Sequence, residues 1–412
     1  MSEQEIMLNS ADQAASTVLA QAMQAAAQGT FPVGGCIVDN HTGRVIYALH
    51  NNVLKTLSTT NKLFTFDPTA HGERQLVYWY FANREVLQLP DPQHLTIVTT
   101  LDPCAMCAGT LLSAGFNVAV VAIDDFAGIN YNESFSFNDL PLNLREKAKN
   151  SFGYYACGDK SQDPSIYVRE YVGSKSVAFN NTRVSAANLM ACGSIFQASV
   201  NTVRDNSSDF GKAPSELTDP ATLPADSPIK QVYKSVCPQA FSLKLNNFRI
   251  PDNNLYKLLL DLKESTPNAQ NACAFIDPFG NLIVAFADTF AQSPVHAAFM
   301  NVTQVYAQVR FKLMNNSATE KIAENTLTHP KYGTFVFLYA PDPTQPNTVM
   351  TLGAYGSTME GPVPQIFPAN FLYYLPPQAG DIMSLTSLIM NLPPFYTELA
   401  QLSVMQTAIT QE

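Results

Sequence analysis

Two periods of apolar residues alternate along the first third of the chain, one typical of helices and one typical of buried strands. Helical spacing covers residues 10–27 and 71–83, and residues 104–114 have the same spacing up to Gly115. Short apolar runs predict strands at 33–38, 44–49, 95–100 and 117–123. The turn sequence at 39–43 joins the first two strands into a hairpin. This order of elements predicts an α/β fold with helices layered on a sheet.

The same succession returns in the second half of the chain. The predicted elements there are a helix at 253–263, strands at 272–276 and 281–286 around a turn at 277–280, a helix at 296–309 and a strand at 334–339. Repetition of one element order predicts an internal duplication. Residues 205–229, rich in Ser, Asp, Pro and Ala, predict a linker between the two units. The expected boundaries are 1–160 for the first domain, 161–230 for the connecting segment and linker, and 231–412 for the second domain.

Length and charge narrow the classes of partner. A chain of 412 residues suits two domains. Its formal net charge of −10 argues against binding nucleic acid mainly through phosphates, because that needs a dense surface of Lys and Arg. A small neutral substrate and water fit this charge better. We expect no membrane segment, because no apolar run reaches the ~18 residues that a spanning helix needs.

The cysteines indicate the compartment. Seven are present, an odd number, and two of them form a Cys-x-x-Cys pair. The N-terminus lacks the basic residues of a signal peptide. A reducing cytoplasm is therefore the expected location. The cysteines outside the pair lie in apolar surroundings and are expected to be buried without metal, namely Cys36, Cys157, Cys192, Cys237 and Cys273.

The chemistry concentrates in two short segments, residues 71–73 (H-G-E) and 103–107 (P-C-A-M-C). The pattern H-x-E followed by P-C-x-x-C supplies one imidazole, two thiolates and one carboxylate, and it is the signature of zinc deaminases. Cysteines three apart at a helix start share one face, and the partial positive charge of the helix N-terminus favours their thiolates. His71, Cys104 and Cys107 are therefore the predicted zinc ligands, with a fourth position open for water.

Glu73 is the predicted proton carrier of this site. Zinc lowers the pKa of its bound water from about 15.7 toward roughly 7, so a zinc-bound hydroxide forms at neutral pH. Glu73 lies two residues from a ligand, and it can take the water proton and pass it to a ring nitrogen and to the leaving amine. The predicted products are ammonia and a carbonyl.

Two other interpretations of the Cys-x-x-Cys pair have to be considered. Such pairs also occur in redox sites and in structural zinc sites. A redox pair does not explain the H-x-E segment about thirty residues upstream. A structural site needs a fourth protein ligand, and none is close in the sequence. Structural zinc remains the alternative to catalytic zinc.

The second copy has lost these groups. One imidazole with a Thr and an Asn cannot hold zinc in a tetrahedral site built for thiolates, so this copy is expected to be free of metal. We expect it to pack on the first copy as an intramolecular pseudo-dimer, with a homodimer as a further option. Aligning 342–347 with 102–107 predicts the replacement of Glu73 by Ala298, Cys104 by Thr344 and Cys107 by Asn347, with His71 retained as His296.

Residues 10–140 resemble the cytidine deaminase-like superfamily, in particular guanine deaminases and tRNA adenosine deaminases. The quoted similarities are D-P-T-A-H-G-E at 67–73 to their D-P-T-A-H-A-E, 101–109 to x-x-P-C-x-M-C-x-G, 51–53 to N-N-V, 31–35 to P-F/V-G-A and 130–135 to F-D-D-S-F. The resemblance implies two tandem three-layer α/β/α domains, each a mixed five-stranded sheet flanked by helices. It also implies four substrate-binding residues, which are Asn51, Gly72, Asp102 and Glu133.

The chain departs from the family in several places. Gly72 replaces the usual Ala, and Glu133 is one methylene longer than the family's Asp. The loop between Asn51 and Asp67 is longer and should border the pocket. Guanine deaminases are also compact single-domain chains, whereas a catalytic copy fused to a dead one is similar to some two-domain bacterial cytidine deaminases.

These observations predict a hydrolase acting on C–N bonds of cyclic amidines, a zinc deaminase of a free nucleobase or nucleoside, with guanine or another purine favoured. One alternative is a deaminase of a base within RNA or DNA, which the tRNA-type motif permits. Another is an interaction protein that keeps a zinc-containing fold without catalysis.

Overall fold

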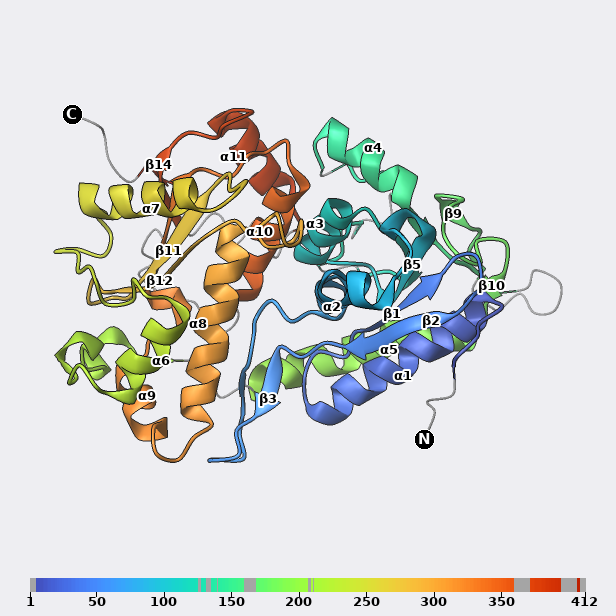
Figure 1. Ribbon diagram of the computed structural model, residues 1–412. Coiled ribbons are helices and arrows are strands. Elements are labelled where there is room, and N and C mark those ends of the chain that lie inside the picture. The colour runs from blue at the N-terminus through green and yellow to red at the C-terminus, as the bar shows by residue number, and fades with distance from the viewer. Residues whose placement is uncertain are drawn as a thin grey trace.

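The computed structural model describes residues 5–124, 127–130, 135–138, 140–158, 168–206, 209, 211–358, 371–393 and 406–407. Within these ranges the chain forms two large mixed sheets covered by helices, together with two small two-stranded sheets (Figure 1). This confirms the predicted α/β class.

The first half supplies five helices and ten strands within the described ranges. The helices are α1 (Ala11–Gln28), α2 (Gly72–Leu87), α3 (Ala105–Ala114), α4 (Leu142–Ser151) and α5 (Ala186–Asn206). The strands are β1 (Gly34–Asp39), β2 (Val45–His50), β3 (Leu54–Thr56), β4 (Leu63–Thr65), β5 (Leu95–Leu101), β6 (Asn117–Ala122), β7 (Phe152–Tyr154), β8 (Ala156–Cys157), β9 (Val172–Gly173) and β10 (Arg183–Val184).

The second half also consists of helices and strands in alternation. Its helices are α6 (Pro228–Val236), α7 (Asn253–Ser265), α8 (Ala298–Met314), α9 (Glu320–Thr326), α10 (Pro346–Thr358) and α11 (Ile382–Asn391). Its strands are β11 (Ala272–Ile276), β12 (Leu282–Ala287), β13 (Thr334–Tyr339), β14 (Phe371–Leu375) and β15 (Gln406–Thr407). Short 3-10 turns lie at Pro92–His94, Pro214–Glu216, Pro220–Thr222 and Pro330–Tyr332.

Local signals explain where the predicted helices begin and end. The Ser10 side chain accepts a hydrogen bond from the backbone N–H of Gln13 and so caps α1. Gly29 ends that helix with a φ of 85°, a left-handed conformation that glycine adopts without steric cost. Gly115 ends α3 in the same way, with a φ of 78°. These caps confirm the predicted ends of both helices to within about one residue.

The two large sheets have the same topology. The first has the strand order β2-β1-β5-β6-β7-β9 and the second has β12-β11-β13-β14-β15. In both, an antiparallel hairpin pairs through its first strand with the next strand, and parallel strands follow. Both hairpins carry a register shift at the same place, between Ile37 and Val38 and between Phe275 and Ile276.

Alternate residues of the strands point to opposite faces. Cys36 and Val38 of β1 belong to the hydrophobic cluster that contains α1, whereas Ile37 joins the cluster that contains α2 and α3. In the second sheet, Ala274 belongs to the cluster with α7, and Phe275 joins α8 and α10. Each sheet therefore lies between two helical layers, as period-two strands require.

The inner helical layers of the two halves share one hydrophobic core. A single cluster contains side chains of α2 and α3 from the first half and of α8, α10 and α11 from the second. Figure 1 shows α3 and α10 next to each other between the two sheets, with α1 and α7 on the outer sides. The halves thus pack through helices, with the sheets farther apart.

Two segments differ from the sequence prediction. The polar stretch after Asn51 contains the small hairpin β3–β4. Its strands are short and hold few apolar residues, so the hydrophobic pattern does not predict them. The first sheet has six strands in place of the predicted five, because β9 pairs with β7.

The segment 168–206 was predicted to be part of the connection, yet it packs on the first sheet. α5 lies against α1, where the Asp12 carboxylate accepts hydrogen bonds from Ser185 N and Asn188 Nδ2, both at 2.8 Å. These contacts place α5 and the residues before it beside the first sheet.

Candidate functional site

Two helix starts bring the predicted zinc ligands together. His71 is the N-cap residue of α2, Cys104 is the N-cap residue of α3, and Cys107 lies in the first turn of α3. The ligand atoms of these three residues all lie within 4.8 Å of one another, and the His71 Nδ1 to Cys104 Sγ distance is 3.5 Å. Among the described residues, this is the cluster of His, Cys, Asp and Glu that fits a metal ion.

The electrostatics of the cluster favour a metal-binding thiolate. A hydrogen bond from the Cys107 thiol, together with the nearby His71 imidazole, holds the pKa of Cys104 well below its usual value. Burial raises the pKa of Cys107 well above its usual value. One imidazole and two thiolates are the donor set of a three-ligand zinc site, so the residues fit the ion.

Glu73 lies in the first turn of α2 and is 3% exposed. Burial raises the pKa of its carboxyl, and the negative charge of Cys104 adds to the rise. Its Oε1 lies 2.9 Å from Thr99 Oγ1 of β5. A raised pKa next to the zinc ligands is what a group that both accepts and donates a proton needs.

Asn51 and Gly72 lie close to each other, next to the N-terminus of α2. Asn51 is 1% exposed, and its Oδ1 accepts hydrogen bonds from Thr30 Oγ1 and Val53 N, both at 2.9 Å. A Cβ added to Gly72 would lie 3.6 Å from Asn51 N, which is ordinary contact. The alanine usual in the family would therefore fit at this position, and the change to glycine is mild.

Asp102 is engaged within the protein. One carboxylate oxygen accepts a hydrogen bond from Asn130 N and the other from Tyr154 Oη, both at 2.8 Å. Burial raises the pKa of this carboxyl to about 7. These contacts fix residues 128–130 beside Cys104, with which Gly128 forms a β-bridge. Glu133, predicted at the substrate, lies outside the described residues.

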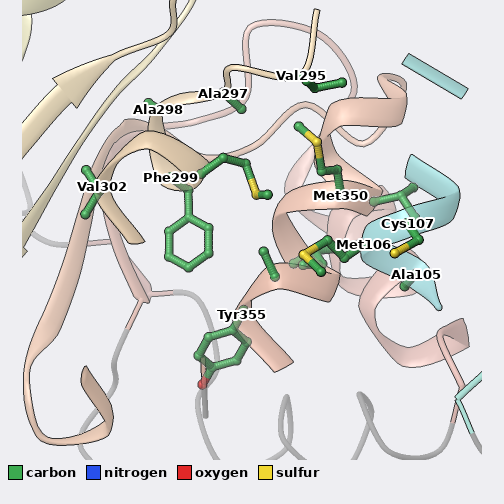
Figure 2. Close-up of a cluster of buried hydrophobic side chains, with 14 of the residues drawn as sticks. Ala105, Met106, Cys107, Val295, Ala297, Ala298, Phe299, Val302, Met350 and Tyr355 are labelled. Carbon is green, nitrogen blue, oxygen red and sulfur yellow. The ribbon is translucent and has the colours of Figure 1, made fainter. Parts of the chain in front are cut away.

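At the corresponding place in the second half, the described residues do not repeat the cluster of His and Cys ligands. α2 and α8 bury side chains at the same positions, so that Leu76 and Tyr80 correspond to Val302 and Tyr306. In this register Ala297 takes the place of His71, and Phe299 takes the place of Glu73. Figure 2 shows Phe299 in a buried apolar cluster, and its ring centroid lies 4.9 Å from that of Phe335.

The predicted equivalences of the second half are therefore off by small shifts. His296 precedes the helix N-cap and stacks near Tyr78 of the first half, with ring centroids 4.9 Å apart. The contact of α3 with α10 pairs the Met106–Gly109 turn with Met350–Gly353, which puts Thr348 and Thr351 at the helix positions of the two cysteines. The sequence alignment does not show this, because six residues separate β13 from α10 whereas three separate β5 from α3.

The structure adds two residues that the sequence did not single out. Thr99 reaches Glu73 from the middle of β5, and a polar residue in a fully buried strand was the available signal. Ser357 of α10 lies 3.2 Å from His71 Nε2, and no sequence pattern marks a contact across 286 positions.

None of the seven cysteines, all of which lie in the described ranges, forms a disulfide bond, and the five outside the cluster are buried. None of the helices in the described ranges combines the length and the apolarity needed to cross a membrane.

Comparison with known proteins finds a match to one protein family and similarity to several solved structures. Residues 9–123 match the family described as the cytidine and deoxycytidylate deaminase zinc-binding region. A solved structure from a study of A-to-I editing by tRNA A34 deaminases is 25% identical, covering 28% of this chain and 75% of its own, with a TM-score of 0.22. A guanine deaminase from Nitrosomonas europaea is 14% identical, covering 48% of this chain and 87% of its own, with a TM-score of 0.29. None of the curated proteins matches the sequence.

The family match covers the segments that carry His71, Cys104 and Cys107, and the fold brings these three side chains into one cluster beside Glu73. Residues 9–123 are therefore similar to the zinc-binding region of cytidine and deoxycytidylate deaminases.

Proposed function

We propose that this protein is a hydrolytic deaminase of a free nucleobase or nucleoside, with guanine as the first candidate. The observation that carries the proposal is the buried Glu73 carboxyl next to the His71, Cys104 and Cys107 cluster. In the reaction, water adds to the ring carbon that bears the amino group, the carbon–nitrogen bond breaks, and the products are a carbonyl and ammonia.

The three ligands would hold zinc and leave one position open. Zinc bound there supplies a Lewis acid that makes water acidic at neutral pH. The remaining steps belong to the protein. Glu73 accepts one proton from water and delivers it to a ring nitrogen as the oxygen adds to the ring carbon. It then carries the second proton, from the added hydroxyl, to the departing amine as the carbonyl forms. The raised pKa of Glu73 suits a group that both accepts and donates a proton. The contact with Thr99 Oγ1 keeps its carboxyl in place.

Asn51 is the proposed residue for orienting the base. Its Oδ1 is held by Thr30 and Val53, which fixes the plane of the amide and directs the Nδ2 donor. The guanine preference is supported by the similarity of residues 51–53 to the N-N-V of guanine deaminases. Gly72, Asp102 and Glu133 complete the proposed set, Gly72 through its backbone and Asp102 by holding the 128–130 segment.

A substrate panel with one matched variant tests the proposal. We expect the full-length zinc protein to release ammonia from guanine, or else from adenosine, cytosine or cytidine. The Glu73→Gln variant keeps the shape of the side chain but cannot accept the proton, so its rate should fall by roughly 10²–10⁴-fold. Zinc content measured by atomic emission should stay at one ion per chain. No ammonia from any of these compounds, or equal rates for wild type and variant, would refute the proposal.

Deamination of a base within RNA is the second candidate, favoured by the D-P-T-A-H-x-E motif at 67–73. The net charge of −10 weighs against it. Binding of tRNA that weakens steeply with salt, together with inosine formation in the bound tRNA, would favour it over the free base. If neither assay responds and zinc is retained, a non-catalytic interaction role takes precedence.

For the second half we propose a metal-free duplicate of the first that forms a pseudo-dimer with it. The shared sheet order and the paired turns of α3 and α10 support this origin. The second half also contacts the loop that should border the pocket. Asn315 Oδ1 accepts a hydrogen bond from Ser58 N at 2.6 Å, and Gln308 Nε2 donates to Asp67 Oδ2 at 3.0 Å. The free buried thiols fit the cytoplasmic location that we propose for the protein.

A further inference from the structure

One side chain of the second half reaches the zinc cluster of the first. Ser357 of α10 is 7% exposed, and its Oγ lies 3.2 Å from His71 Nε2. The other ring nitrogen, Nδ1, lies 3.5 Å from Cys104 Sγ. The two nitrogens of one imidazole therefore face different halves of the molecule.

These contacts assign a role to each nitrogen. Nδ1 points to the thiolates and is the nitrogen that can ligate the metal. Nε2 then carries the proton of the neutral ring, and its N–H donates to Ser357 Oγ. Such a bond fixes both the tautomer and the orientation of a ligating histidine, and it makes the ring a better ligand.

We propose that Ser357 is a positioning residue for the zinc site, supplied by the half that holds no metal. The zinc site of the first half is then incomplete without the second half. This gives the degenerate copy a chemical task in addition to covering apolar surface.

The packing of α10 explains how a distant serine reaches the site. A Cβ added to Gly353 would lie 2.0 Å from Met106 N, and one added to Gly109 would lie 2.2 Å from Met350 N. The two helix backbones therefore touch at these glycines. Ser357 follows Gly353 by one helical turn, which carries it past the contact toward the N-terminus of α2.

The same geometry offers a matched control. Ser113 follows Gly109 by the same four residues on α3, and its Oγ donates to Gly109 O at 2.7 Å. By the reciprocal contacts of Gly109 and Gly353, Ser113 takes the position on α3 that Ser357 takes on α10. Ser113→Ala and Ser357→Ala thus remove the same group from equivalent helix positions.

The test is zinc affinity of the full-length protein, measured by competition with a chelator after the metal has been removed. We expect Ser357→Ala to bind zinc 10–100-fold more weakly than wild type, as for other outer partners of metal ligands. Ser113→Ala should stay within about twofold, and Ser357→Thr, which keeps a hydroxyl, should recover most of the affinity. Unchanged affinity of Ser357→Ala, or an equal loss in both alanine variants, would overturn the proposal.

A second measurement separates positioning from folding. Urea unfolding of the metal-free proteins should show a smaller effect of Ser357→Ala than the effect on zinc affinity, because the proposed role of the bond is to position the metal-ligating histidine. A loss of stability in the metal-free variant as large as its loss of zinc binding would also overturn the proposal, since it would indicate a structural role.

The inference rests on the proposed function only in that zinc is the resident metal. The readout is metal binding, so it does not depend on finding the substrate. A chain that needs Ser357 for tight zinc binding but releases no ammonia would support this inference and refute the deaminase. Ammonia release together with unchanged zinc affinity in Ser357→Ala would support the deaminase and refute this inference.

Discussion

At the scale of single residues, the environment determines how each titratable group behaves. His296 shows this away from the zinc cluster. It lies half-buried between the halves, near the Tyr78 ring and the buried Arg74 guanidinium. Burial, and then the charge of Arg74, lowers the pKa of His296 to about 4. The unfolded chain keeps the ordinary value of about 6.5.

This difference predicts an acid-sensitive contact between the halves. Below pH 6.5 the unfolded chain takes up a proton that the folded protein refuses until about pH 4, so His296 makes the free energy of unfolding fall as the pH drops through this window. The variant His296→Gln should lose less stability than wild type between pH 6.5 and 4.5, as measured by urea unfolding. His41→Gln, in an exposed turn, controls for the loss of a histidine elsewhere. Parallel pH curves for wild type and His296→Gln would contradict the assignment.

At the scale of elements, the contact of α3 with α10 connects the second half to the zinc ligands. α3 carries Cys104 at its N-cap and Cys107 in its first turn, so any displacement of this helix moves both sulfurs. Figure 2 shows Met106 and Cys107 of α3 beside Met350 of α10. Gly109 and Gly353 allow the two helices to approach this closely, because a side chain at either position would clash with the backbone of the other helix.

Enlarging one of these glycines should therefore separate the helices. For Gly353→Ala the new Cβ lies 2.0 Å from Met106 N, which the backbone must relieve by moving. We expect the free energy of unfolding to fall by about 1–3 kcal/mol, with reduced zinc retention on dialysis. The control is Gly193→Ala in α5, where the nearest atom is the Ala122 Cβ at 3.6 Å. There the change should be neutral or stabilising by up to about 1 kcal/mol. Equal effects at the two positions would contradict the role of the contact.

At the scale of the whole molecule, a buried ion pair joins three parts of the chain. Asp209 of the linker accepts two hydrogen bonds from Arg310 of α8, at 2.6 and 2.7 Å. The two side chains are 1% and 8% exposed. The Arg310 guanidinium also lies 4.7 Å from the centroid of the Phe64 ring in the β3–β4 hairpin. Linker, second half and first half therefore meet at one charged group.

Removing one charge of this pair should lower the free energy of unfolding more than replacing both residues with apolar ones. Arg310→Met removes the guanidinium from the buried Asp209 carboxylate, so the free energy of unfolding should fall by about 3–5 kcal/mol. The double variant Arg310→Met with Asp209→Leu removes both charges and should recover most of that loss. Urea unfolding of the four proteins in a double-mutant cycle measures the difference. A double variant as unstable as Arg310→Met would mean that the ion pair itself, rather than the unpaired charge, determines the effect.

The sequence determined the local features of this protein. The helix and strand periods, the end of α3 at Gly115, and the H-x-E and P-C-x-x-C segments all depend on residues a few positions apart. The structure has the helix end and the metal-binding cluster where the sequence predicts them. The strands β11 and β13 have the predicted bounds, because short buried runs end at turn residues.

Only the tertiary structure decided what depends on distant residues. In the second half, Ala297 and Phe299 hold the helix positions of His71 and Glu73. A local alignment could not give this register, because insertions between strand and helix leave no mark on periodicity. The buried state of Glu73 arises from a β5 threonine and the packed helices around it. The contact of Ser357 with His71 spans 286 positions, and side-chain hydrogen bonds of that range follow from how two sheets and their helices pack, which no single segment encodes.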